Sequence, residues 1–224
     1  MKISPRLLKS SVDGGIAPAM NYLAHLYFSA PRPLAWTGSL MGDFFKGNNF
    51  DGLPDDLVFH LKLHRRLDTF TLSSPPFQSS RRRLDPGFGH GRSILVDVFY
   101  DHLLACRWDT YAEVPLPDFA REVYSGLHVC YHYLPARLQE QLPRMTAADW
   151  LSSYRHEDVV ERVLQRLEQR LRHKIPLASG YQQLSRHRAG LEEDFTAFMA
   201  DIRAYVQVLC ADATSLAGDR MAGP

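Results

Sequence analysis

Apolar residues recur at helical spacing along most of this chain, and that periodicity constrains its fold more than any other feature. The pattern predicts helices over residues 54–71, 91–108, 118–133, 150–172 and about 184–209. We find no run of alternating β-branched residues closed by a tight Asn-Gly or Asp-Gly turn. The sequence therefore predicts an all-α fold, built as a single-domain helical bundle.

The length and composition are those of one soluble globular domain. With 224 residues, the chain is long enough for one well-buried core and short for two. Its residues are 45% hydrophobic and 23% charged, which argues against wholesale disorder. A formal net charge of +1 argues against a dedicated nucleic-acid-binding protein. No apolar run approaches the roughly 20 residues that span a bilayer, so we expect no membrane association.

Composition also divides the chain into three parts. The ordered helical pattern begins at Met20, whereas glycines and a proline interrupt the preceding segment. We therefore expect a flexible N-terminal extension at 1–19, a helical domain at 20–212 and a flexible C-terminal tail at 213–224. Met1 and Met20 are both candidate start sites. The cysteines are widely spaced without a metal-binding pattern, which indicates reduced packing residues in a cytoplasmic protein.

Acidic and histidine side chains interrupt the apolar helical segments. Asp43 lies in Leu-Met-Gly-Asp-Phe-Phe-Lys-Gly, and His64 and Asp68 lie in Leu-His-Arg-Arg-Leu-Asp. Asp97 and Asp101 lie in the most apolar of the predicted helices. An unpaired charge is very costly to bury, so these groups need a counter-charge or a metal ion. They are the candidate site of chemistry.

The spacing of these groups favours one shared site. His64 and Asp68 stand four residues apart, which places both side chains on one face of a helix. Asp97 and Asp101 repeat that spacing. Together with Asp43 they supply the mixed nitrogen and oxygen ligands that hold Mn²⁺, Mg²⁺ or Fe²⁺, and the lack of cysteine argues against a closed structural zinc site. The sequence predicts an open, catalytic metal site; the alternative is a set of surface pairs, with Asp97 neutralising a buried arginine.

Further residues are candidates for a catalytic role. His102 is a candidate ligand, proton donor or partner of a ligand. Lys46 and Arg65 offer positive charge for a phosphate. His25 is a catalytic candidate, although we read it as a hydrogen-bonded core histidine in preference to a ligand. His60 is expected to be exposed.

The chain resembles a known family at several separate blocks. These are MNYLAHLYFS (20–29), GDFFKG (42–47), LHRRLDTFT (63–71), LVDVFYDHLLACRW (95–108) and WLSSYR (150–155). In their order and spacing they are similar to the acyl carrier protein phosphodiesterase family, or ACP hydrolases, regarded as divergent members of the HD-domain-like metal phosphohydrolases. The resemblance covers nearly all of the chain after residue 20.

The resemblance implies a helical fold, a divalent metal such as Mn²⁺, and a specific hydrolysis. The reaction it implies is cleavage of the phosphodiester between 4′-phosphopantetheine and a serine of the carrier protein, which yields the apo carrier protein. Carrier proteins of this kind are acidic, so the arginine-rich faces of the chain gain a partner. The implied metal-site positions are Asp43, His64, Asp68, Asp97 and Asp101, with His102 close by. One departure is Leu72, where relatives often carry an acid.

Two other functions stay open at this point. The first is a metal phosphohydrolase of the same broad fold that acts on a nucleotide or another small phosphodiester. The second is a non-catalytic helical module that docks an acidic partner through its arginines and uses the buried ionic residues as structural pairs. A substrate panel separates the first from a carrier-protein enzyme, and metal content separates the second.

Overall fold

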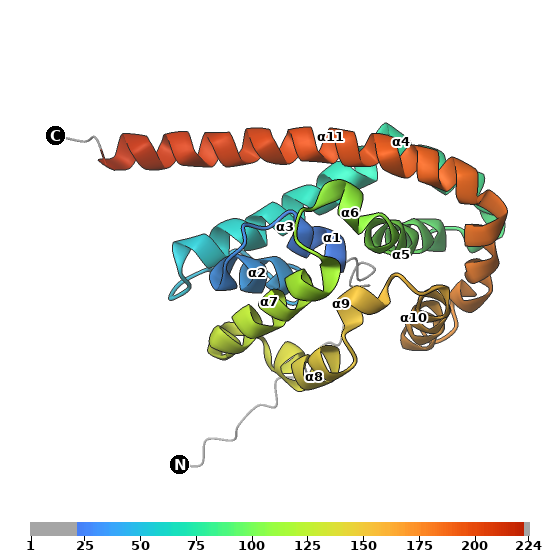
Figure 1. The fold of residues 1–224 in the computed structure, drawn as a ribbon, viewed down its shortest axis with the longest axis horizontal. Helices are drawn as coiled ribbons and strands as arrows, with labels where there is room; N and C mark the ends of the chain where they lie inside the picture. Colours follow the sequence, from blue (N-terminus) through green and yellow to red (C-terminus); the bar gives the residue numbers. More distant parts are fainter. Residues whose placement is uncertain (1–21, 222–224) are drawn as a thin grey trace, which may run out of the picture.

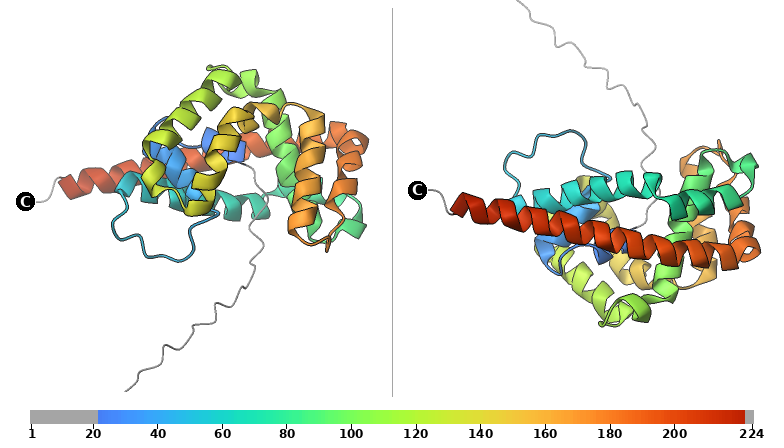
Figure 2. Two further views of the ribbon diagram at one scale, coloured as in Figure 1. Left: turned by 90° about the horizontal axis from the view of Figure 1, so that it is seen from below. Right: turned by 90° about the horizontal axis from the view of Figure 1, so that it is seen from above.

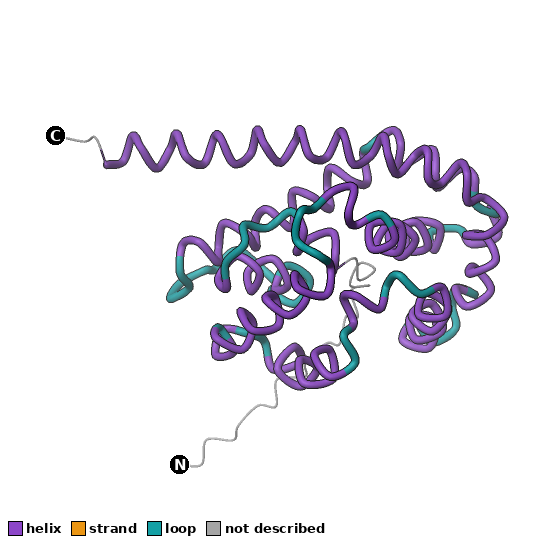
Figure 3. The backbone as a smooth tube through the Cα atoms, viewed as in Figure 1, coloured by secondary structure: helices purple, strands orange, loops and turns teal. Residues whose placement is uncertain are grey.

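The computed structural model describes residues 22–221, and these residues form helices joined by loops, with no strand among them (Figures 1 and 3). The predicted all-α fold is confirmed. The α-helices are α1 (Tyr22–Tyr27), α2 (Pro33–Met41), α3 (Asp55–Ser73), α4 (Pro75–Arg83), α5 (Gly91–Cys106), α6 (Trp108–Tyr111), α7 (Leu116–Val129), α8 (Ala136–Ala147), α9 (Trp150–Ser153), α10 (Glu157–Arg170) and α11 (Tyr181–Met221). Short 3-10 turns lie at η1 (Pro86–Phe88), η2 (Tyr131–Tyr133) and η3 (Leu177–Gly180).

The predicted helices occur, but three of them are shorter than expected or divided. The helix expected over 118–133 is α7, which ends at Val129 and is followed by the 3-10 turn η2. The helix expected over 91–108 ends at Cys106, and α6 begins separately at Trp108. The helix expected over 150–172 is divided into α9 and α10, so its predicted continuity is wrong. Asp149 adopts a left-handed conformation, with φ of 39°, and its side chain accepts the N–H of Ser152, which caps α9. His156 is extended and redirects the chain into α10.

The structure bears on only one of the two expected domain boundaries. The extension expected at 1–19 lies outside the described residues. Helix α11 continues to Met221, so this helix does not end at the boundary expected after residue 212. The flexibility expected of residues 213–224 stays a prediction.

Helix α5 is the buried centre of the fold, as its apolar sequence predicts. Leu95, Val98, Phe99 and Leu104 are fully buried on different sides of it. It packs against α1, α4, α10 and α11. Helix α11 packs along α4 and crosses α5, which Figure 1 shows nearly end-on (Figures 1 and 2). No described helix combines the length and hydrophobicity needed to cross a bilayer.

Glycines allow α2 and α3 to pack very closely. A β carbon on Gly38 would lie 2.1 Å from the carbonyl oxygen of Leu57, and one on Gly42 would lie 2.2 Å from Cγ of His64. Neither distance is possible for a real side chain, so only glycine permits this approach. The loop that follows α2 projects away from the helices before the chain returns into α3 (Figure 2). The close packing places the end of α2 directly beside His64.

Candidate metal centre

Three side chains from two helices converge at the candidate site. His25 comes from α1, and His64 and Asp68 come from successive turns of α3. The Nε2 atom of His25 is 3.2 Å from Oδ1 of Asp68, and Nε2 of His64 is 3.3 Å from Oδ2 of Asp68. One potential ligand atom from each of the three residues lies within 4.8 Å of the others. We call these residues the metal triad.

The two histidine rings of the metal triad are stacked and buried. Their centroids are 3.6 Å apart with an interplanar angle of 16°. Asp43, which directly follows the end of α2, places Oδ1 3.3 Å from Nε2 of His64. The predicted proximity of Asp43, His64 and Asp68 is therefore observed.

Charge within the site is strongly coupled. Burial lowers the pKa of His25, and the charge of His64 lowers it further. Burial also acts to lower the pKa of His64, but the carboxylates of Asp43 and Asp68 outweigh it and raise that pKa to about 9. Burial acts to raise the pKa of Asp68, whereas the two imidazoles hold it well below its usual range. The site thus favours a negatively charged Asp68 beside a positively charged imidazole.

The donor atoms fit a divalent metal ion. The ring nitrogens of His25 and His64 are buried and, among the described residues, none has a partner with hydrogen-bond geometry. Buried polar atoms of this kind need a partner. Two imidazole nitrogens and a carboxylate suit Mn²⁺ or Fe²⁺ and, less well, Mg²⁺. The Asp68 side chain is 31% exposed, so the metal triad is open to solvent on one side.

Asp97 lies beside the metal triad and outside it. This half-buried residue of α5 and His25 line the same small cavity, of about 20 Å³. That space is sufficient for about one water molecule. Burial, together with the charges of Asp68 and Asp101, raises the pKa of Asp97 well above its usual value. Asp97 therefore holds a proton more readily than an ordinary aspartate does.

Asp101 contacts the backbone of α1. Its Oδ2 accepts the N–H of Leu23 at 3.1 Å, and its Oδ1 accepts the N–H of Ala24 at 2.9 Å. Burial raises its pKa to about 8, although these two donors act in the opposite direction. Asp101 thereby satisfies N–H groups that a helix N-terminus leaves unpaired. It positions the helix that carries His25.

The structure does not bring His102, Lys46 and Arg65 into the metal triad. His102 Nδ1 is 2.8 Å from the carbonyl oxygen of Tyr154, on the α9 side of α5. Lys46 is exposed. The Arg65 guanidinium donates to the carbonyl oxygens of Phe45 at 2.6 Å and Gly47 at 3.0 Å, so it fixes the loop after Asp43.

Two sequence expectations about histidines differ from the structure. His60 is only 2% exposed, so the expectation of an exposed residue is wrong. The reason is tertiary, because α2 packs against α3 and covers much of its surface. His25 is buried as expected, but it lies in the metal triad, where sequence reasoning favoured a core residue. The only sequence signal for its role was its place in an apolar segment.

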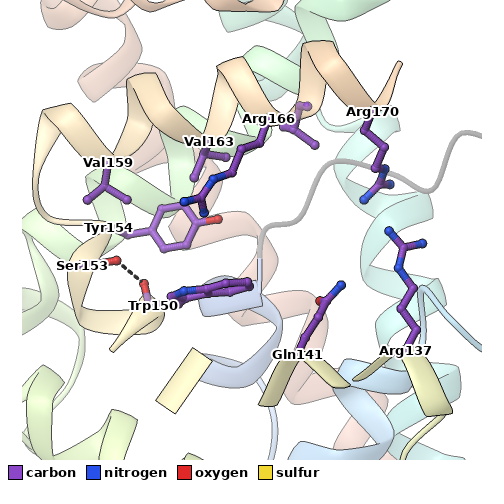
Figure 4. Close-up of a pocket in the computed structure, with 10 residues that line it drawn as sticks. Arg137, Gln141, Trp150, Ser153, Tyr154, Val159, Val163, Arg166 and Arg170 are labelled. Carbon is purple, nitrogen blue, oxygen red and sulfur yellow. Dashed lines mark hydrogen bonds between the residues drawn. The ribbon is translucent and has the colours of Figure 1, made fainter. Parts of the chain in front are cut away.

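A larger cavity, of about 220 Å³, lies among α8, α9 and α10 (Figure 4). We call it the arginine cavity because Arg137, Arg166 and Arg170 line it. Its remaining lining residues are mainly apolar or aromatic. They are Gln141, Trp150, Ser153, Tyr154, Val159, Val163 and Leu167.

Comparison with known proteins connects this chain to one family. The sequence model described as "Acyl carrier protein phosphodiesterase" matches residues 20–202. A protein of that name from Enterobacter sp. (strain 638) is 31% identical over 180 residues, which cover 80% of this chain and 93% of the relative. Its namesake from Yersinia pestis is 30% identical with the same coverage. No solved structure matches the chain. The chain belongs to the acyl carrier protein phosphodiesterase family.

Proposed function

We propose that this protein is a divalent-metal-dependent phosphodiesterase that removes 4′-phosphopantetheine from holo acyl carrier protein. The observation that carries the proposal is the metal triad. The buried ring nitrogens of His25 and His64 lie close to the Asp68 carboxylate, but they do not have the geometry of hydrogen bonds to it. The names of the relatives supply the substrate class. Mn²⁺ is the proposed ion, with Mg²⁺ and Fe²⁺ as alternatives.

The proposed reaction is a hydrolysis in which water attacks phosphorus and the bond from phosphorus to the serine oxygen breaks. The serine oxygen receives a proton, and the products are the apo carrier protein and 4′-phosphopantetheine. A divalent ion supplies a Lewis acid that polarises the phosphoryl oxygens and makes a water molecule more acidic. His25, His64 and Asp68 would hold the ion, and Asp43 orients the His64 ring.

The other residues of the proposed mechanism hold and deliver protons. The carboxyl of Asp97 lines the small cavity together with His25, and burial raises its pKa, which favours its protonated form. We assign it the delivery of a proton to the departing serine oxygen. Asp101 holds α1, and therefore His25, in place. We assign Asp101 this positioning role in place of a ligand role.

The proposed partner is an acidic carrier protein, and the proposed compartment is the cytoplasm. The arginine cavity offers exposed positive charge on α8 and α10. Opposite charge on a partner raises the association rate and makes it dependent on salt. Increasing salt is therefore expected to raise KM for the carrier protein more than it lowers kcat.

The test is the intact mass of holo acyl carrier protein after incubation with the enzyme and Mn²⁺ or EDTA. Loss of the 4′-phosphopantetheine mass only with Mn²⁺ is expected. His64→Ala and Asp97→Ala are expected to abolish the loss while retaining helical circular dichroism. An unchanged carrier mass with folded, metal-loaded enzyme would contradict the proposal, and cleavage of small phosphodiesters alone would favour the alternative substrate class.

A further inference from the structure

The arginine cavity combines an apolar wall with a cationic rim. Trp150 from α9 and Val159, Val163 and Leu167 from α10 supply much of the wall, and Tyr154 is buried behind them. Figure 4 shows the Trp150 ring and Val163 on opposite sides of the space. A cavity of about 220 Å³ has the volume of about seven water molecules. It is large enough for a flexible organic chain and small for a folded peptide element.

The arginine side chains converge. Arg137 from α8 and Arg170 from α10 point toward one another across the cavity, and Arg166 points into it from above Trp150 (Figure 4). Arg137 and Arg166 place like charges on the rim of one cavity, and an anion there offsets their repulsion. Among the described residues, neither of these two arginines forms an ion pair with a carboxylate. The rim is therefore suited to an anionic ligand group.

One arginine of the cavity rim lies near the residue that follows Asp43. The Arg137 guanidinium carbon lies 5.9 Å from the centroid of the Phe44 ring, and Phe44 directly follows Asp43. Tyr22, on the same helix as His25, is buried, and its hydroxyl has no hydrogen-bond partner among the described residues. Burial raises its pKa, and the charges of Asp43, Arg170 and Arg137 also act on it. Tyr22 is thus close both to Asp43 in the candidate metal centre and to the arginines of the cavity rim.

We propose, on the basis of the proposed function, that the arginine cavity binds the pantetheine arm of the substrate while the phosphodiester lies at the metal triad. The arm carries methyl and methylene groups that would pack between Trp150 and Val163. It also carries amides, for which Gln141 and the Ser153 hydroxyl offer partners. Arg137, on the side of Asp43, is placed to contact the anionic oxygens of the phosphodiester.

The first test measures binding without catalysis. The full-length protein is titrated with 4′-phosphopantetheine, pantetheine and inorganic phosphate, and tryptophan fluorescence is recorded. Trp150 is the half-buried tryptophan that lines the cavity, whereas Trp36 and Trp108 are buried elsewhere. We expect saturable quenching by 4′-phosphopantetheine that Trp150→Phe removes. Equal quenching by phosphate alone, or none by 4′-phosphopantetheine, would overturn the proposal.

The second test fills the cavity. Val163→Phe is expected to lower kcat/KM for holo acyl carrier protein at least about tenfold, since overfilling a packed site is costly. Hydrolysis of bis(4-nitrophenyl) phosphate, which lacks the arm, should not change. Val208→Phe, the same change at an exposed position of α11, is the matched control. Gln141→Phe is the second cavity variant and decides the outcome if Val163→Phe does not fold.

The outcomes separate this inference from the proposed function. If the wild-type protein cleaves the holo carrier protein and both cavity variants keep its kcat/KM, the arm does not occupy the cavity and only this inference fails. If the wild-type protein leaves the holo carrier protein intact, the proposed function fails. The fluorescence titration then still decides whether the cavity binds the arm. If an arginine variant weakens carrier binding while the cavity variants have no effect, the rim serves only the attraction of the carrier protein, and this inference fails.

Discussion

The imidazole of His64 lies directly against the α carbon of Gly42, so closely that a β carbon at residue 42 would be 2.2 Å from Cγ of His64. The same close approach brings Asp43, the next residue, to 3.3 Å from Nε2 of His64. Gly42 is thus needed for the position of a proposed metal ligand. Gly38, about one helical turn earlier in α2, instead lies against the backbone carbonyl group of Leu57.

Replacing Gly42 with alanine is expected to impair metal binding more than folding. The new methyl group would lie 2.2 Å from Cγ and 2.8 Å from Cβ of His64, so the His64 ring must move and α3 must shift slightly with it. The expected loss of stability is about 1–3 kcal/mol. Gly38→Ala is the contrasting variant, because its methyl group meets the Leu57 carbonyl and should destabilise the fold more strongly. Mn²⁺ titration and urea unfolding of both variants measure the two effects. Wild-type Mn²⁺ affinity in Gly42→Ala would contradict this role of the glycine.

Removing the Asp101 carboxylate is expected to destabilise the protein and disturb His25. Asp101→Ala leaves the N–H groups of Leu23 and Ala24 without their acceptors. Each unsatisfied buried donor costs about 1–3 kcal/mol. Urea unfolding is therefore expected to show a loss of about 2–5 kcal/mol. Asp118→Ala, at a more exposed carboxylate in the first turn of α7, is the control. Equal stability of the two variants would show that Asp101 does not hold α1.

His60 is expected to make the protein sensitive to acid. Burial lowers its pKa from 6.5 to about 4 in the folded state. Between those values the unfolded chain binds more protons than the folded one, so the free energy of unfolding falls as pH falls. The shift corresponds to a loss of up to about 3 kcal/mol by pH 4.

The measurement for His60 is the unfolding free energy at several pH values between 7 and 4. His60→Leu, with an apolar side chain of similar burial, should show a smaller decrease over this window than the wild-type protein. His128→Leu, at an exposed position of α7, should leave the wild-type decrease unchanged. Parallel curves for the wild-type protein and His60→Leu would refute the assignment.

Arg65 is expected to act by fixing the loop after Asp43. Its guanidinium donates to two backbone carbonyl oxygens, those of Phe45 and Gly47. Lysine lacks the planar fork and is not expected to replace it. Arg65→Lys should speed hydrogen exchange of the loop amides and lower the unfolding free energy by up to about 1.5 kcal/mol. The exposed Arg66→Lys is the matched control. Unchanged exchange in Arg65→Lys would show that the loop is held by other contacts.

The spacing of apolar residues predicted the main helices, because a helix with one buried face carries apolar residues at regular intervals along that face. Helix α5 is buried on many sides, as its nearly continuous apolar sequence predicted. The division between α9 and α10 was not predicted. It depends on the left-handed conformation of Asp149 and the extended conformation of His156, and local apolar spacing does not encode either.

The candidate site was predictable where its residues share one helix. The spacing of His64 and Asp68 placed them on one face of α3, and both contact each other as expected. His25 was missed as a member of the metal triad because its approach to α3 depends on how α1 packs in the folded chain. The same spacing argument failed to distinguish Asp97, beside the small cavity, from Asp101, which binds the backbone of α1. Spacing determines a face of a helix, and tertiary packing determines what that face meets.

The most direct test of the account is the number of Mn²⁺ ions that the purified protein binds, measured by electron paramagnetic resonance of free Mn²⁺ during a titration. The account predicts one tight site in the wild-type protein, its loss in His25→Ala, His64→Ala and Asp68→Ala, and its retention in His102→Gln, since His102 contacts the backbone of Tyr154. Tight binding that survives all three substitutions in the metal triad would contradict the account.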